Sequence, residues 1–339
     1  PRPDFDEQRA LAAGIRKISS KHLDLYTDLP PSPQVDELPQ VFDLAIAQWC
    51  DYFHVEPEQA ANWKMIGHVI DRKERFIGAN LLPDDLPPFL NGYQRGWEFW
   101  VYEQPSPYFR RHLVLHEGTH AFMTWMLGNC GPPWYMEGMA EMLATHQWKN
   151  GRLEMNYFPQ NREEVEQWGR IKIVQDDVRA GRGLSLLNIT SYNSTAHLRI
   201  EPYGWSWAAC AFLDRHPDQQ SWFRSLRGKV AEADEFQQAV ELRLQQGGRR
   251  LAEQWQLFTD QLDYGYDLPQ EIIIFAENRP MPEPGVSIRV SARHGWQSTG
   301  IRLRPGQTFV MEAAGRYQIG LNPKTWWCEP GGVTIEYYR

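Results

Sequence analysis

The spacing of apolar positions differs between three parts of the chain. Near the N-terminus, residues 36–53 carry apolar side chains every three or four positions, which predicts a helix. Short alternating or continuous apolar runs, typical of strands, surround it at residues 22–28, 63–70 and 96–102. Helices beside one sheet predict an α+β lobe over residues 1–105.

From Ser106 onward the pattern becomes mostly helical. Ser106-Pro107 is a typical helix start, because Ser caps free N–H groups and Pro is tolerated at the first helical position. Gly128 is a typical stop for the same helix. Together these segments predict a helical lobe over residues 106–265. We expect its further helices near residues 134–147, 162–179, 204–215, 218–226, 233–245 and 251–262.

The last part of the chain changes character again. Short β-like runs separated by Gly and Pro predict a small β-sandwich module over residues 270–339. The runs are residues 286–292, 301–304, 308–312 and 333–338. The predicted fold class is therefore α+β, with a mixed-sheet N-terminal lobe, a helical lobe and a small all-β module.

Composition excludes several classes of protein. The chain has 339 residues, 42% of them hydrophobic, and 35 Lys and Arg against 43 Asp and Glu, for a net charge of −8. Without a basic block, we expect no nucleic-acid partner. No run approaches the roughly 20 apolar residues of a membrane span. Four widely spaced cysteines without a CxxC pair exclude a zinc ribbon. Every disulfide pairing stays open, and so does the state in which the cysteines are free thiols. They are Cys50, Cys130, Cys210 and Cys328.

One motif inside the first helix of the helical lobe points to metal chemistry. His116-Glu117-Gly118-Thr119-His120 has the form HExxH. The two histidines are four residues apart, so both imidazoles lie on one helix face and can reach one ion. Glu117 projects to the side, where it can hold a water molecule without binding the metal. Two His and an open position suit one tetrahedral Zn²⁺ per chain, which lowers the pKa of bound water to about 7.

A second acidic motif follows on the next predicted helix. It reads Trp134-Tyr-Met-Glu137-Gly-Met-Ala-Glu141, after a loop rich in Gly and Pro that can turn the chain back. Glu137 can complete a His₂Glu ligand set. Glu141 lies one turn further on, where it can accept the outer N–H of His116 or His120, a partner that ligating histidines almost always have. Both carboxylates share a helix side that is otherwise apolar, which disfavours a simple solvated face.

These motifs resemble the gluzincin zinc metallopeptidases, in which HExxH is followed by a Glu on the next helix. The W-x-x-E-G-x-A-E form is most similar to the aminopeptidase-N-like branch and its bacterial relatives, over roughly residues 90–215. The resemblance implies a peptidase with a peptide or protein substrate, in which His116, His120 and Glu137 bind zinc and Glu117 is the general base. It also implies a catalytic Tyr early in a later helix, and Tyr203 matches that position as a donor to the oxyanion.

The chain departs from this branch in one motif. Its aminopeptidases carry a G-x-M-E-N edge strand that binds the free amino terminus of the substrate, whereas residues 91–100 here read NGYQRGWEFW. An endopeptidase is therefore expected, with a strand that can still pair with an extended peptide. His112 and His146 are interpreted as a helix-surface and a helix-end residue.

The C-terminal module loosely resembles small galactose-binding β-sandwich lectins, through residues 296–300 and 306–310. This resemblance implies a glycan as a second partner. Two alternatives stay open: a glycan-binding or adhesion protein with a structural or vestigial zinc site, and a zinc hydrolase that acts on a non-peptide bond. A secreted, periplasmic or cell-surface location is expected, because peptidases with an accessory β module are usually exported and the sequence begins without Met.

Overall fold

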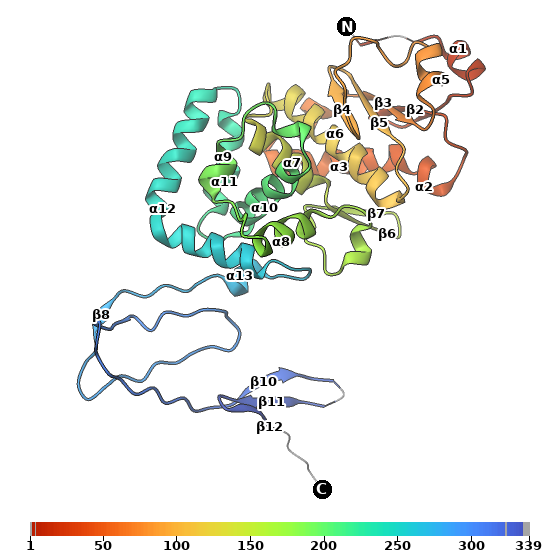
Figure 1. Cartoon of the computed structure of the whole chain (residues 1–339). Coiled ribbons are helices and arrows are strands. Elements are labelled where there is room, and N and C mark those ends of the chain that lie inside the picture. The colour runs from red at the N-terminus through yellow and green to blue at the C-terminus, as the bar shows by residue number, and fades with distance from the viewer. Residues whose placement is uncertain (1, 4, 323, 335–339) are drawn as a thin grey trace. The chain divides into compact units, whose positions relative to one another are not determined.

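The chain divides into two compact units, Pro1–Pro269 and Gln270–Arg339 (Figure 1). The computed structural model describes residues 2–3, 5–322 and 324–334. The first unit holds a mixed sheet and most of the helices, and the second carries its regular structure mainly as short strands. The α+β class is thus confirmed. Among the described residues, no helix has the length and apolar character needed to cross a membrane.

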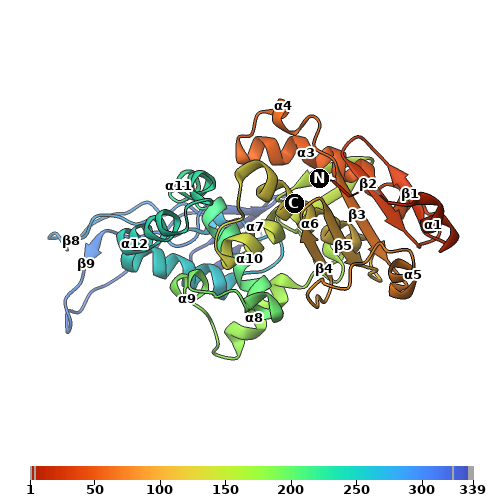
Figure 2. The same cartoon turned by 90° about the horizontal axis from the view of Figure 1, so that it is seen from above.

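Five strands form the sheet of the first unit, in the order β1-β2-β3-β5-β4. The three central strands are parallel, and the edge strands β1 and β4 are antiparallel to their neighbours. Figure 2 shows β4 at the edge nearest the helical region. The predicted strands are confirmed as β2, β3 and β5. The bounds are β1 Arg16–Ser19, β2 Leu23–Thr27, β3 Met65–Ile70, β4 Gly92–Arg95 and β5 Glu98–Tyr102.

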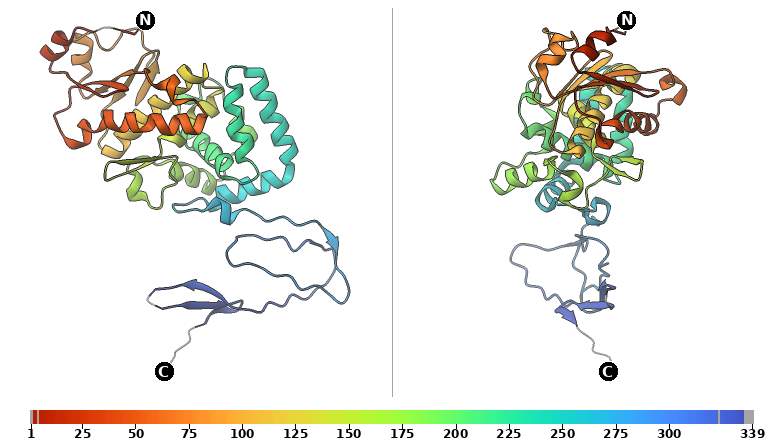
Figure 3. Two further views of the ribbon diagram at one scale, coloured as in Figure 1. Left: turned by 180° about the vertical axis from the view of Figure 1, so that it is seen from behind. Right: turned by 90° about the vertical axis from the view of Figure 1, so that its right-hand side faces the viewer.

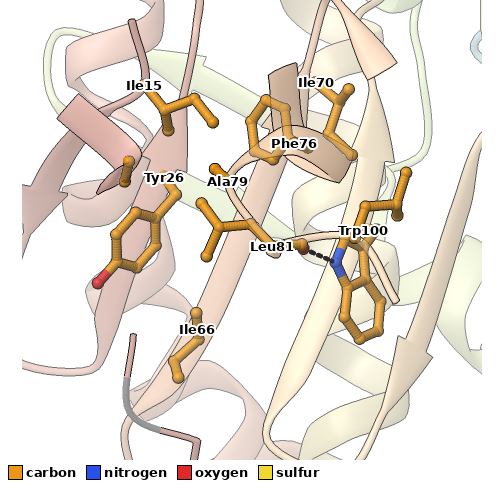
Figure 4. Packing of buried hydrophobic residues seen from close by; sticks show 10 residues of the cluster. Ile15, Tyr26, Ile66, Ile70, Phe76, Ala79, Leu81 and Trp100 are labelled. Carbon is orange, nitrogen blue, oxygen red and sulfur yellow. Dashed lines mark hydrogen bonds between the residues drawn. The ribbon is translucent and has the colours of Figure 1, made fainter. Parts of the chain in front are cut away.

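Helices cover both faces of this sheet. Phe99 of β5 stacks on Phe42 of α3 (Leu38–Phe53), with ring centroids 6.1 Å apart. On the opposite face, Trp100 belongs to an apolar cluster that includes Phe76 of α5 (Lys73–Gly78) and Ala10 of α1 (Glu7–Ala12). The indole N–H of Trp100 donates to a loop carbonyl, at 2.8 Å (Figure 4). Successive side chains of a strand point to opposite faces, and helices pack against both faces here. The sheet is therefore a buried middle layer. The short helices α2 (Pro33–Asp36) and α4 (Pro57–Ala60) flank α3.

The rest of the first unit is mainly helical, as the sequence predicts. Helix α6 begins after Ser106, whose hydroxyl accepts from the N–H of Phe109, and continues into a π-helix that ends at Gly128 (φ 82°). Helix α12 spans both helices expected after residue 233, with a kink at Gly248 (Figure 3, left). The helices are α6 Pro107–Phe122, the π-helix Met123–Leu127, α7 Pro133–Ala144, α8 Arg170–Arg179, α9 Leu186–Thr190, α10 Glu201–Arg215, α11 Gln220–Ser225, α12 Ala233–Gln261 and α13 Leu268–Glu271. Short 3₁₀ turns occur at Arg162–Val165, Ala196–Leu198 and Leu226–Lys229, and β6 (His146–Lys149) pairs with β7 (Arg152–Met155).

The second unit contains two small sheets. Strands β10 (Tyr317–Gly320), β11 (Trp326–Glu329) and β12 (Gly332–Thr334) are antiparallel, and β8 (Arg279–Pro280) pairs with β9 (Ile301–Arg302). The run 333–338 begins within β12, and residues 335–338 lie outside the described part. The runs 286–292 and 308–312 form no strand, and Val290 and Val310 in them are 67% and 83% exposed. The strands were predicted there from alternating apolar and polar residues alone. Within the described residues, neither run pairs with a neighbouring strand.

A glycine allows α7 and α10 to approach closely. A methyl group at position 138 would lie 2.5 Å from the carbonyl oxygen of Ser206 and would overlap the sulfur of Cys210. Only a residue without a side chain permits this separation of the two backbones. Gly138 directly follows Glu137 on α7, so the contact also fixes where that carboxylate lies.

We expect Gly138→Ala to lower the free energy of unfolding by about 1–3 kcal/mol, because the added methyl group forces α7 away from α10. Urea denaturation followed by circular dichroism measures the change. Gly78→Ala, at a helical position where a methyl group meets open space, is the matched control and should be neutral or slightly stabilising. Equal stability of the two variants would show that the close approach is not a constraint.

Candidate metal centre

Helix α6 brings its two HExxH histidines together on one face. The Nε2 atoms of His116 and His120 are 3.0 Å apart. Glu137, from the first turns of α7, directs Oε2 to within 3.3 Å of His116 Nε2 and 3.5 Å of His120 Nε2. Three ligand atoms bound to one tetrahedral zinc at 2.0–2.1 Å would lie about 3.3–3.4 Å apart. The three residues predicted to bind the metal thus converge with the spacing that one ion requires.

Burial of these groups supports the same interpretation. The side chains of His116, Glu117, His120 and Glu137 belong to residues that are at most 9% exposed. Glu137 Oε2 is buried and accepts no hydrogen bond from the described residues, although such atoms are normally satisfied. Burial would raise the pKa of Glu137, but His120 and His116 outweigh it and lower the pKa to about 2. The carboxylate is therefore ionised, as a metal ligand must be.

Glu117 lies between the two histidines and the sheet edge. A side chain at position 92 would overlap its carboxylate, so Gly92 of β4 leaves the space that Glu117 occupies. Burial raises the pKa of Glu117, and the adjacent His116 and His120 offset this only in part. A carboxylate with a raised pKa is a stronger proton acceptor. The arrangement suits a general base that faces an edge strand.

Glu141 of α7 connects its own helix to α6, which carries the HExxH motif, and to α8. Its carboxylate accepts two hydrogen bonds from Arg170 of α8, at 2.9 and 2.8 Å, and contacts His112 Nε2 at 3.1 Å. Its Oε1 also lies 3.4 Å from His116 Nδ1, the outer nitrogen of a candidate ligand. Burial would raise the pKa of Glu141, but Arg170 and His112 hold it well below its ordinary value. At a separation of 3.4 Å, His116 Nδ1 forms no hydrogen bond with a described residue, so the orienting role of Glu141 stays a prediction.

Tyr203 lies in the first turn of α10, next to the candidate centre. Its ring centroid is 6.2 Å from that of His116, and the guanidinium of Arg170 lies over the ring at 5.5 Å. Burial, with the carboxylates of Glu137 and Glu117, raises the pKa of Tyr203. The hydroxyl group therefore stays protonated and able to donate a hydrogen bond.

A second group of potential ligands overlaps the first. His112, His116 and Glu141 also offer atoms close enough to share an ion. Arg170 already places a cation on both oxygens of Glu141, however, and a metal ion there would be repelled by it. We therefore regard His112 and Glu141 as supports of the centre formed by His116, His120 and Glu137.

Sequence reasoning misassigned two histidines, His112 and His146, and missed Arg170. His112 is fully buried between Glu141 and the carbonyl of Ala144, which corrects its interpretation as a helix-surface residue. His146 begins β6, not a helix end, and stacks on Tyr108 with ring centroids 4.6 Å apart. Arg170 had no recognisable motif. The spacing of His112 four residues before His116 was the one signal available for any of them.

The comparisons with known proteins do not assign the chain. No protein-family model matches its sequence, and the search of curated proteins gives no match.

All four cysteines are buried free thiols. The sequence left both disulfides and free thiols open, and the structure contains the free thiols.

We expect Arg170→Gln to lower the free energy of unfolding by about 3–5 kcal/mol, because it leaves the Glu141 carboxylate buried without its cation. It should also weaken zinc binding about 10- to 100-fold, through the lost orientation of His116. Urea denaturation and competition with a zinc-binding dye measure the two effects. Lys172→Gln, on the exposed side of the same helix, is the control, and equal behaviour of both variants would exclude the anchoring role.

Proposed function

We propose that this protein is a zinc-dependent peptidase of gluzincin type that acts as an endopeptidase. The observation that carries the proposal is the convergence of two Nε2 atoms and one carboxylate oxygen within 3.0–3.5 Å. A further carboxylate outside this group, that of Glu117, interacts electrostatically with all three of these residues. A structural metal site needs no such base, which favours catalysis over the alternative of a vestigial site.

Each residue has a distinct part in the proposed reaction. His116, His120 and Glu137 would hold Zn²⁺, which supplies Lewis acidity to a scissile carbonyl and to a water molecule. Glu117 accepts a proton from the attacking water and delivers it to the leaving amine. Tyr203 donates a hydrogen bond to the developing oxyanion. Glu141, held by Arg170, keeps the His116 ring in its orientation.

The edge of the sheet supports a polypeptide substrate over a small ester. The N–H of Tyr102 donates to the carbonyl of Asn91. Hydrogen-bonded pairs alternate in an antiparallel ladder, so the backbone N–H and C=O groups of Tyr93 and Arg95 also point towards β5. The backbone groups of Gly92 and Gln94 point away from β5. Their outward N–H and C=O groups can pair with an extended peptide. The peptide would then pass Glu117 where Gly92 contacts it.

We expect protein purified without chelator to contain about one zinc per chain by elemental analysis. Glu137→Gln should weaken zinc binding by at least about tenfold, because it removes the charged ligand. His294→Ala, in the second unit, is the control and should keep full occupancy. Failure of the wild-type protein to bind zinc supplied at neutral pH would contradict the proposed centre.

We expect Glu117→Gln to lower peptide hydrolysis at least about a hundredfold while zinc content stays unchanged, because the amide accepts no proton. Cleavage of a peptide library followed by mass spectrometry measures the loss, and Glu154→Gln, at an exposed position of β7, is the matched control. Wild-type turnover by Glu117→Gln would refute the mechanism. Hydrolysis of an ester panel with no peptide cleavage would instead favour the alternative of a non-peptide hydrolase.

A further inference from the structure

Two tryptophans form an exposed pair at the end of strand β4. Trp97, in the turn between β4 and β5, packs against Trp125 of the π-helix with ring centroids 3.9 Å apart. Trp125 is 40% exposed and Trp97 is half-buried. The indole N–H of Trp125 donates to the carbonyl of Gly96 at 2.9 Å, which fixes the pair to the strand end.

The pair lies on the same side of the strand as the candidate centre. Gly92 faces Glu117, and Gln94, two residues further on, shares that face because side-chain directions alternate. The Gln94 amide donates to the carbonyl of Gly96, the same atom that accepts from Trp125. The line from Glu117 to the tryptophans therefore follows one face of β4, over a distance of about 13 Å for four residues.

The metal-binding helix sets the position of Trp125 as well. The π-helix follows α6 without a break, and Trp125 is five residues beyond His120. π-Helical segments occur frequently at functional sites. The two tryptophans thus extend two elements of the candidate centre, since Trp97 follows the edge strand and Trp125 follows the helix with the HExxH motif.

We infer that Trp97 and Trp125 form a substrate subsite that binds an aromatic or large aliphatic side chain of the polypeptide cleaved. This inference rests on the proposed function. Antiparallel pairing, the more stable arrangement per residue, runs the peptide from Gly96 towards Gly92. The side chain bound by the tryptophans then lies two to four residues before the scissile bond, on its N-terminal side. The occupant is the substrate itself, because its backbone pairs with the same strand.

The test maps cleavage sites in a peptide library, prepared by tryptic digestion of a cell lysate, for the zinc-loaded full chain. Wild-type protein should favour Phe, Tyr, Trp, Leu or Met two to four residues before the cleaved bond, by about three- to tenfold over Ala. Trp125→Ala should reduce this preference to less than about twofold and leave preferences beyond the scissile bond unchanged. Trp125→Phe, which keeps an aromatic face, should retain most of the preference.

Controls separate binding from folding. Trp327→Ala, which changes a partly exposed tryptophan of the second unit, should leave the cleavage pattern unchanged. Zinc content and melting temperature of Trp125→Ala should match the wild-type protein, since the side chain is partly exposed. Should the melting temperature fall, Trp97→Ala provides a second variant with the same expected loss of preference.

The outcomes distinguish the two proposals. An unchanged preference in Trp125→Ala and Trp97→Ala, with active enzyme, overturns the subsite and leaves the peptidase intact. A preference confined to positions after the scissile bond overturns it as well. Absence of cleavage by the zinc-loaded wild-type protein overturns both the subsite and the proposed function.

Discussion

A carboxylate buried without partners would cost several kcal/mol. Most of the candidate centre is arranged so that one buried carboxylate, that of Glu141, has its partners. Glu141 is 1% exposed, and it meets the guanidinium of Arg170 and the imidazoles of His112 and His116. These partners come from α6 and α8, so three helices must keep one relative position. The same ion pair places the Arg170 cation against the face of Tyr203. Loss of this single group would disturb a candidate ligand and a candidate oxyanion donor together.

The candidate metal ligands could be predicted from the sequence because they follow local rules. Helical spacing alone puts His116 and His120 on one face, and the Gly- and Pro-rich loop explains the return that brings Glu137 to them. The parallel strands β2 and β3 were also predictable, because β2 alternates apolar and polar residues and β3 is almost continuously apolar, as strands buried on both faces often are. Whether zinc binds and peptides are cut stays a prediction.

Other features depend on distant contacts that no local pattern records. Arg170 is a charged residue whose partner lies on a different helix, and a single sequence offers no sign of such a pair. His112 was interpreted as a surface residue because the buried carboxylate that contacts it, Glu141, lies on a different helix. In the second unit, alternation was a poor guide because it reports which side chains share a face and not whether a partner strand exists.

The glycine at position 92 has a consequence for the substrates that the proposed enzyme could attack. Where Glu117 contacts β4, the strand presents peptide backbone without a side chain. Backbone recognises extension and direction, not residue identity, so access at this point depends on the conformation of the incoming chain. A folded protein would have to release a segment from its own secondary structure before that segment could align with β4. Susceptibility would then follow the local unfolding equilibrium of the target, and loops or unfolded chains would be cut before stable domains.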